Sequence, residues 1–310
     1  MVIQHNIAAI NSYRNLGTNQ SGLNKNLEKL SSGYRINRAG DDAAGLAISE
    51  AMRSQINGLN QATKNAQDAV GLIQTAEGAL TEVHSMLQRL TTLASQSANG
   101  TYNSIARGNL QAEADQLLEE IDRIANYTDF NGIKPLATGT STPVTVSGGS
   151  KTDEKATYVD PTDNKQMTFQ IGPSAQEVIK VNQQDMTSTG IGVNQLHSKA
   201  TAAQADANGV KGMIGSQSAA NTAIKVINAA INIVSSYRAK LGAAQNRLEH
   251  TVNNLKVTSE NITAAESRIR DTDMADEITA FTKNNILLQA SQSMLAQSNS
   301  VPQSVLSLLQ

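Results

Sequence analysis

The sequence predicts a mainly α-helical fold, a long antiparallel helical bundle or coiled coil with a small insertion that contains a β-hairpin. Two observations carry this prediction: apolar residues recur at heptad spacing in both halves of the chain, and the composition changes abruptly between those halves. The 310 residues include no Trp, three Phe and six Tyr, so the aromatic side chains that dominate thick globular cores are scarce. Ala, Leu, Ile and Val supply the apolar content, which favours thin contacts between helices.

The first heptad pattern steps by three and then four residues from Leu59 to Ala94, and every position on it is apolar. Its members are Leu59, Ala62, Ala66, Ala69, Ile73, Ala76, Leu80, Val83, Leu87, Leu90 and Ala94. Sustained spacing of this kind is typical of helices packed along a common seam. At 1.5 Å per residue, the segment would form a rod of roughly 54 Å.

Two further patterns step by four and then three residues. The longer one passes through Ala220, Ile224, Ile227, Ile231, Val234, Arg238, Leu241, Gln245, Leu248, Val252, Leu255, Ser259 and Ile262. The shorter one passes through Leu110, Ala114, Leu117, Ile121 and Ile124. Together with the first pattern they predict three long helices bundled together.

Both ends of the chain carry weaker patterns. One passes through Gln20, Leu23, Leu27, Leu30 and Tyr34, and the other through Ile278, Phe281, Asn285, Leu288, Gln292 and Leu295. Each is narrow and rich in polar residues, so it offers little apolar area against an ordering cost of about 1–2 kcal/mol per residue. We expect the two ends to need each other and neighbouring copies of the chain, and to become ordered on polymerisation.

Between the helical halves, residues 138–195 are predicted to form a small surface insertion. Four of the five prolines fall in or just before this region, beside many Thr, Ser and Gly. The strand candidates are 142–148, 156–160, 166–172 and 177–183, chosen by alternation and β-branched content. Segment 196–219 is predicted as a loop or a weak helix leading back into the bundle.

Composition excludes several classes of function. A net charge of −2 and a pI near 6.1 provide no basic surface for nucleic acid, and no apolar run is long enough to span a membrane. The N-terminus lacks the pattern of a cleavable secretory signal. The chain has no cysteine, and its four histidines show no metal-ligand spacing. The glycines of 190–193 indicate a turn. We therefore predict no catalytic, metal or cofactor site, and no enzyme.

The stretch LSSGYRINRAGDDAAGLAIS, residues 30–49, raises the question of a cation site at Asp41 and Asp42. Neighbouring residues supply no further oxygen ligands. We therefore expect one of the two carboxylates to cap the helix that contains Leu46 and Ile48. Gly40 and Gly45 are interpreted as turn or helix-breaking residues, which makes this stretch a joint between two coaxial helical segments.

Long segments of the chain resemble bacterial flagellins, the subunits of flagellar filaments. The resemblance rests on LEKLSSGYRINRAGDDAAGLAIS (27–49), LASQSANGT (93–101), LGAAQNRLEHTVNNL (241–255), ENITAAESRIRDTDMADEI (260–278) and ILLQASQSMLAQSN (286–299). With their flanks these stretches cover about 1–137 and 210–310.

The resemblance implies a division into three parts. Residues 1–43 with 271–310 would form an inner, antiparallel terminal coiled coil, and Leu23, Leu27, Leu30, Ile278, Phe281, Leu288 and Leu295 would line its polymerisation seams. Residues 44–137 with 196–270 would form a rod-like bundle with a β-hairpin. Residues 138–195 would be a short variable β insertion.

The resemblance also implies partners and a location. The chain would assemble with copies of itself and meet the flagellar cap, the hook-associated proteins and an export chaperone or assembly regulator. It would be extracellular after type III export. In flagellins that activate Toll-like receptor five, innate immune recognition centres on residues that correspond to Arg89, Leu93 and Glu113. The alternative interpretation of these three residues is a solvated helix face used in subunit contacts.

For the whole chain, the alternative function is that of a hook–filament junction protein.

Overall fold

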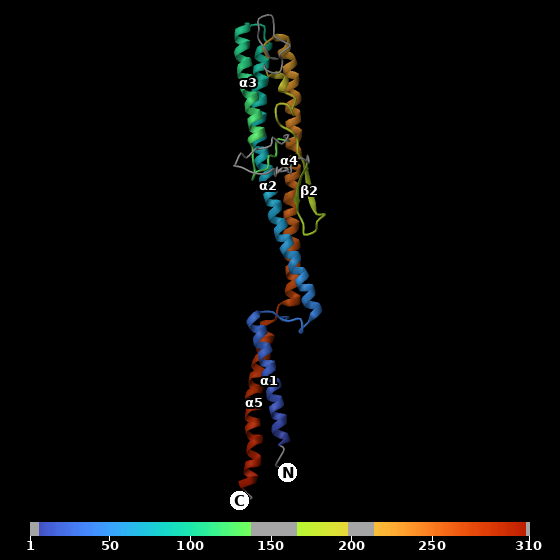
Figure 1. Ribbon diagram of the computed structural model, residues 1–310, viewed down its shortest axis with the longest axis vertical. Helices are drawn as coiled ribbons and strands as arrows, with labels where there is room; N and C mark the ends of the chain where they lie inside the picture. The colour runs from blue at the N-terminus through green and yellow to red at the C-terminus, as the bar shows by residue number, and fades with distance from the viewer. Residues whose placement is uncertain (1–5, 138–165, 198–213, 308–310) are drawn as a thin grey trace, which may run out of the picture. The chain divides into compact units, whose positions relative to one another are not determined.

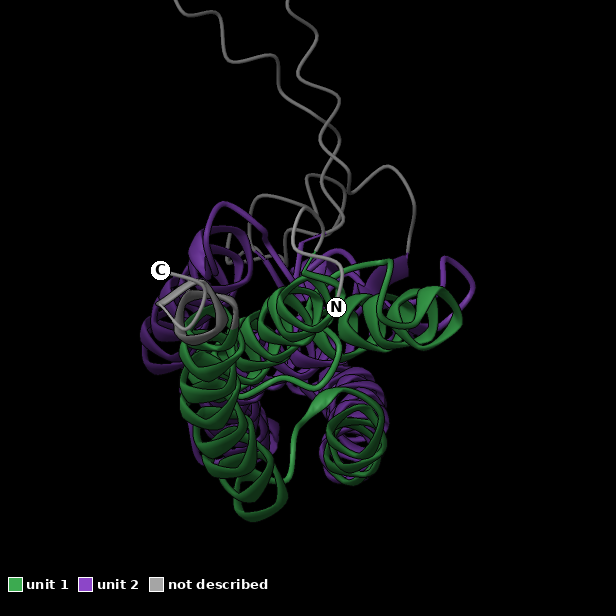
Figure 2. Ribbon diagram, turned by 90° about the horizontal axis from the view of Figure 1, so that it is seen from below, with its two compact units in different colours: residues 1–58, 257–310 green, residues 59–256 purple. Residues whose placement is uncertain are grey.

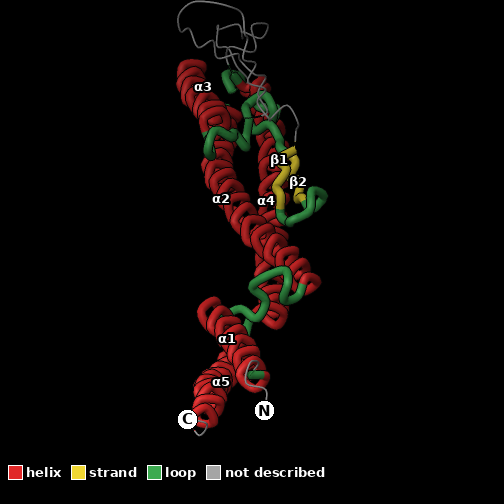
Figure 3. Tube along the Cα trace, turned by 60° about the horizontal axis from the view of Figure 1, so that its bottom comes forward, coloured by secondary structure: helices red, strands yellow, loops and turns green. Residues whose placement is uncertain are grey.

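The computed structural model describes residues 6–137, 166–197 and 214–307 and is mainly α-helical. Figure 3 distinguishes the helices from the two strands. The helices are α1 (Ile7–Ser32), α2 (Ala43–Ala98), α3 (Ser104–Tyr127), α4 (Gln217–Arg270) and α5 (Met274–Ser307), and the strands are β1 (Gln166–Gln170) and β2 (Val178–Asn182). The predicted fold class is confirmed.

The chain divides into two compact units, coloured separately in Figure 2. Unit 1 comprises residues 1–58 and 257–310, and unit 2 comprises residues 59–256. The resemblance found in the sequence implies three parts of the chain, with boundaries at residues 43, 137, 195 and 270. The two compact units are a coarser division and do not test those boundaries, which stay a prediction.

The core of unit 2 lies along α2, where α3 and α4 pack beside it (Figure 1). All positions of the heptad pattern from Leu59 to Ala94 are buried, with at most 3 % of each side chain exposed. The stripe contains both Ala and the larger Leu, Ile and Val, so the helix axes can approach closely where Ala lies while the larger side chains interdigitate. The prediction for this helix is confirmed residue by residue.

The predicted pattern was displaced by one residue at every second position of α3 and at four positions of α4, whereas Val252 and Leu255 of α4 are buried as predicted. On α4 the buried side chains include Ala223, Ala230, Tyr237 and Ala244, where the sequence pattern selected Ile224, Ile231, Arg238 and Gln245. On α3 they are Gln111, Ala114, Leu118, Ile121 and Ala125, where the pattern selected Leu110, Leu117 and Ile124.

The displaced residues lie at the edge of the seam. Ile224 and Ile231 pack against the core while remaining partly exposed, and Arg238 pairs with Glu77 of α2 at 3.5 Å. At Ala223, Ala230 and Ala125 a small side chain takes the central position, which lets the helices approach closely. A pattern that ranks residues by hydrophobicity selects the larger neighbouring isoleucine at these three positions.

The strands β1 and β2 form an antiparallel hairpin in which Phe169 is opposite Ile179. Met167, Ile179 and Val181 are buried in the core of unit 2, and the hairpin lies along α4 in Figures 1 and 3. Asn65 of α2 donates a hydrogen bond to the carbonyl oxygen of Gln170 at 3.2 Å. Both later strand predictions are confirmed, whereas candidates 142–148 and 156–160 lie outside the described residues.

The segment that follows the hairpin is attached to α3. The backbone N–H and the hydroxyl of Ser188 donate to the two carboxylate oxygens of Asp122, at 2.6 and 2.8 Å. Residues 190–193 form a turn with Gly192 at a φ of 78°, as predicted. The ambiguous segment 196–219 begins in a short 3₁₀ helix (η2, Asn194–Leu196), and α4 begins at Gln217.

The burial of Tyr237 leads to a prediction of how the stability of unit 2 depends on pH. Its ring is 1 % exposed, and burial raises its pKa to about 12, against a smaller opposing effect of the Gln184 backbone. The folded state therefore holds this proton more tightly than the unfolded chain, so the stabilisation is complete below pH 10 and is lost as the pH rises through 12. We expect a loss of about 2–3 kcal/mol over that range.

Urea unfolding of the wild-type chain and of Tyr237→Phe between pH 8 and 12 measures this contribution. The variant should lose less stability over the alkaline range than the wild-type chain. The same substitution at Tyr127, which is 74 % exposed, is the matched control. Parallel pH profiles for all three proteins would contradict the prediction.

Candidate assembly and recognition surfaces

The helices α1 and α5 pair side by side in unit 1, with the two chain ends at the same end of the pair (Figure 1). Among the described residues of unit 1, Ile36 is the one apolar side chain that is fully buried. The predicted seam residues Leu23, Leu30, Phe281, Leu288 and Leu295 are half-buried. The pair therefore has a thin apolar contact.

Two of the predicted seam residues point away from this contact. Leu27 is 55 % exposed and Ile278 is 52 % exposed. They are therefore available to another molecule, whereas Leu288 and Leu295 belong to the contact between α1 and α5 or its edge.

Polar side chains hold much of the α1–α5 contact. Asn19 donates to the hydroxyl of Ser291 at 2.8 Å, and Lys29 pairs with Glu277 at 3.6 Å. The amide nitrogen of Asn26 is buried without a hydrogen-bond partner. Asparagines at seam positions of coiled coils specify register and lower stability. The polar contacts between α1 and α5 therefore specify which helices pair more than they stabilise the pair.

The outer faces of both helices carry uncovered apolar side chains. Of the seventeen large apolar side chains that are exposed in the described ranges, thirteen belong to unit 1. They are Ile7, Ile10, Tyr13, Leu27, Tyr34, Ile48, Val257, Met274, Ile278, Ile286, Leu287, Met294 and Val301. We call Leu287, Met294 and Val301 the outer stripe of α5, because they recur at seven-residue spacing.

Sequence reasoning missed the outer stripe. Leu288 and Leu295 had already been taken as the apolar positions of this helix, and the stripe lies one residue before them. A second heptad phase in the same segment was the signal that could have revealed it.

The joint between α1 and α2 contains the two adjacent carboxylates. The side chain of Asp42 accepts a hydrogen bond from the backbone N–H of Gly45 at 2.9 Å, so the predicted helix cap is confirmed. The carboxylate of Asp41 accepts from the backbone N–H groups of Arg38 and Asn37, and these bonds lower its pKa. Both acidic groups thus order the turn.

Gly45 does not break a helix, contrary to the prediction. It lies inside the first turns of α2. A Cβ at this position would collide with the carboxylate of Asp42 and with Ile36, so glycine is needed for the close approach of the capping side chain. Gly40 lies in the turn, as predicted.

A second set of contacts ties this joint to the connection between α4 and α5. The backbone N–H of Arg35 donates to the carbonyl of Arg270 at 2.7 Å. The guanidinium of Arg270 bonds Glu50 at 2.8 Å and stacks over the ring of Tyr34 at 4.6 Å. The two connections are therefore held together within unit 1 by contacts of Arg270, and the backbone N–H of Thr272 adds a hydrogen bond to the carbonyl of Gly33 at 3.0 Å.

The predicted recognition residues lie where α2 meets α3. Arg89 of α2 pairs with Glu113 of α3 at 2.7 Å, and both side chains are about half exposed. Leu93 is fully buried in the core of unit 2, although the sequence pattern placed it on an adjacent, accessible face. Leu93 is buried because α3 covers this side of α2. The apolar pattern of α2 alone does not show where a second helix packs.

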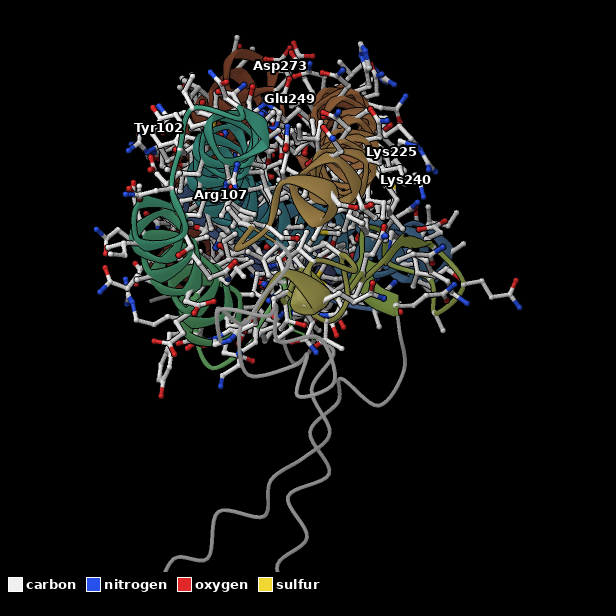
Figure 4. All side chains as sticks on the ribbon, turned by 90° about the horizontal axis from the view of Figure 1, so that it is seen from above. Tyr102, Arg107, Lys225, Lys240, Glu249 and Asp273 are labelled. Carbon is white, nitrogen blue, oxygen red and sulfur yellow. The ribbon has the colours of Figure 1, made fainter. Side chains whose placement is uncertain are left out.

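The connection between α2 and α3 is ordered by its own hydrogen bonds. Figure 4 shows Tyr102 and Arg107 at this end of unit 2, with Lys225 and Lys240 on α4. The guanidinium of Arg107 donates to the carbonyls of Ser97 and Asn99 at 3.0 and 3.1 Å. The side chain of Asn103 caps α3 by accepting from Ala106 at 2.7 Å.

Two further observations concern the chemistry of the described ranges. None of the helices there combines the length and apolar character that a membrane crossing requires. Within the same ranges, no three His, Asp or Glu side chains come together as metal ligands would.

Comparisons with known proteins agree with this architecture. The profile described as the bacterial flagellin N-terminal helical region matches residues 3–141, and that of the C-terminal helical region matches residues 224–309. The chain is 52 % identical to a flagellin of Bacillus subtilis (strain 168) and 44 % identical to the flagellar filament 33 kDa core protein of Treponema phagedenis. Both alignments cover the whole of each chain.

A solved structure shares the fold. The putative flagellar hook-associated protein from Vibrio parahaemolyticus matches with a TM-score of 0.52, covering 74 % of this chain and all of that one. The TM-score supports a shared fold, whereas a sequence identity of 13 % gives no support to the hook–filament alternative. With matching profiles at both ends and relatives aligned along its full length, the chain belongs to the bacterial flagellin family.

Proposed function

We propose that the outer faces of α1 and α5 are the main surfaces through which this flagellin polymerises. The chain is a structural subunit of the bacterial flagellar filament, and flagellins are structural proteins, not enzymes. The observation that carries the proposal is the concentration of uncovered apolar side chains in unit 1. Exposed apolar surface of this kind marks protein interaction sites. When other copies cover this surface, they supply the stability that the thin α1–α5 contact lacks.

The contacts between copies would be heterologous. A face on one subunit meets a different face on the next, and a rotation that does not close produces a helical filament. The stripe on α5 and the exposed Ile7, Ile10 and Tyr13 of α1 are different surfaces on one unit, as such contacts require. Leu27 and Ile278 belong to the same proposal, because both are exposed beside the α1–α5 contact.

Electron microscopy of the concentrated, purified chain tests this function. Long, uniform filaments are expected, and protection of α1 and α5 from hydrogen exchange should rise on assembly. A chain that stays monomeric at high concentration, or filaments in which α1 and α5 gain no protection, would contradict the proposal. The predicted ordering of both ends on assembly is tested by the same measurement.

We propose the remaining partners and the finer architecture from the resemblance to the family. We assign residues 1–43 with 271–310 to an inner layer, residues 44–137 with 196–270 to a rod-like layer, and residues 138–195 to an outer insertion. The flagellar cap and the hook-associated proteins would meet the filament outside the cell. An export chaperone or assembly regulator would bind the C-terminal region before secretion, where α5 leaves apolar side chains uncovered.

We also propose that the monomer is recognised by Toll-like receptor five through Arg89 and Glu113. The two side chains form an exposed ion pair that bridges α2 and α3, so the receptor would meet a preformed charged feature. Leu93 is buried and would act by holding Arg89 in position. The competing use of this face is contact between subunits.

A reporter-cell assay with purified monomer tests receptor recognition. Arg89→Ala and Glu113→Ala should each lower the response at least about tenfold, the expected effect of truncating a contact worth more than 1.4 kcal/mol. Lys225→Ala, on the exposed surface of α4, is the control. No response to the wild-type monomer would refute recognition. A normal response that neither substitution changes would refute the assigned residues.

A further inference from the structure

We propose that Met294 is an oxidation site through which hydroperoxides block polymerisation of the subunit. The inference rests on the assembly role proposed for α5 and adds a chemical modification that controls it. Its basis is the sulfur content of the chain and the place of this thioether on the outer stripe.

Methionine carries all the sulfur in this protein. The chain has eight methionines and no cysteine, so no thiol competes for an oxidant. Met294 is 62 % exposed and Met274 is 45 % exposed, whereas Met167 and Met186 are 8 % and 0 % exposed. Oxidation of thioethers follows their accessibility, so Met294 should react first among the methionines that the structure describes.

Met294 lies in the middle of the outer stripe of α5. Leu287 precedes it by seven residues and Val301 follows it by seven, so the three side chains lie on one face of the helix. From Asn284 to the C-terminus the sequence contains no charged side chain. A new polar group at residue 294 would therefore have no charged side chain to pair with in the helix from Asn284 onward, and neighbouring copies would have to bury it.

The chemical step needs a hydroperoxide as its oxidant. A lone pair on the sulfur attacks the nearer peroxide oxygen, the S–O bond forms and the O–O bond breaks. With hydrogen peroxide, the departing oxygen keeps one hydrogen and takes up the proton of the transferred oxygen, leaving as water. The sulfur is oxidised by two electrons, and the peroxide is reduced by two.

The product changes the surface without adding a charge. A sulfoxide is polar and accepts hydrogen bonds, and its formation disrupts interfaces that contain methionine. Covering this oxygen with apolar neighbours removes its hydrogen bonds to water. We expect the critical concentration for assembly to rise on the order of tenfold or more, the measure of a lost contact of this size.

The experiment treats purified monomer with graded hydrogen peroxide. Peptide mass spectrometry locates the sulfoxides, and sedimentation measures the critical concentration. Wild type and Met274→Leu should lose assembly as residue 294 is oxidised, whereas the critical concentration of Met294→Leu should not change between its own untreated and treated samples at the same dose. Methionine sulfoxide reductase should restore the wild-type protein. Met294→Gln should raise the critical concentration without any oxidant, which separates polarity from other oxidative damage.

Three outcomes overturn the inference. Wild-type protein with sulfoxide at residue 294 could assemble at an unchanged critical concentration, Met294→Leu could lose assembly as wild type does, or buried Met186 could oxidise before Met294. Failure of the untreated wild-type chain to polymerise would instead overturn the assembly role of α5, and this inference with it. Circular dichroism of each variant before treatment establishes that it is folded.

Discussion

Leu288→Glu should abolish filament formation while the bundle of unit 2 stays folded. The side chain is half-buried on α5, and the α1–α5 contact has little apolar area to spare. A carboxylate there would have to be desolvated without a partner, or the helices would separate, which also disturbs the outer surfaces that copies need. We expect the critical concentration to rise by at least about a hundredfold, corresponding to about 3 kcal/mol per subunit.

Sedimentation and electron microscopy measure this loss, and circular dichroism reports whether the helices of unit 2 remain. Leu288→Met is the matched control, because it conserves volume and apolar character and should polymerise normally. Leu295→Glu should behave like Leu288→Glu, since it is also half-buried on α5. Normal filaments from either glutamate variant would show that the seam is assigned wrongly.

The second large effect is expected at Ala230 of α4. Ala230 is 0 % exposed in the core of unit 2, so Ala230→Asp would leave an unpaired carboxylate between helices. We expect a loss of about 3–5 kcal/mol in the free energy of unfolding. Ile231→Asp should cost only about 1–2 kcal/mol, because Ile231 is partly exposed at the edge of the seam and can turn its charge to water.

This pair of adjacent substitutions distinguishes the two phases of the seam. Urea unfolding of both variants, in the monomer so that assembly does not add to stability, compares them directly. If Ile231→Asp proved the more damaging, the phase selected from hydrophobicity would be right and the packing of α4 wrong. Equal losses would also contradict the structure, because the two side chains differ in burial.

Much of the fold was predictable from local patterns. The stripe from Leu59 to Ala94 was predicted at every position, because each of its members is Ala, Leu, Ile or Val. A cap by one of Asp41 and Asp42 and the two strands within residues 166–182 were also predictable, because they depend on local patterns. Helix caps and strand alternation depend on residues within a few positions of one another.

The candidate surfaces were less predictable. Leu93 looked accessible on α2, and its burial became evident only once α3 was in place. The ion pair between Arg89 and Glu113 joins residues 24 apart, which a helical period cannot connect. The outer stripe of α5 was missed because the phase through Leu288 already explained that helix.

The amino-acid sequence by itself determined which segments are helical, where the joint and the hairpin lie, and that the chain belongs with filament subunits. The tertiary structure decided which of two adjacent residues faces the core: Ala230 and not Ile231, Tyr237 and not Arg238. The physical reason is that a helix carries its period in its own sequence, whereas the burial of a side chain depends on the neighbouring helix. Close packing can favour a small residue over a more hydrophobic one.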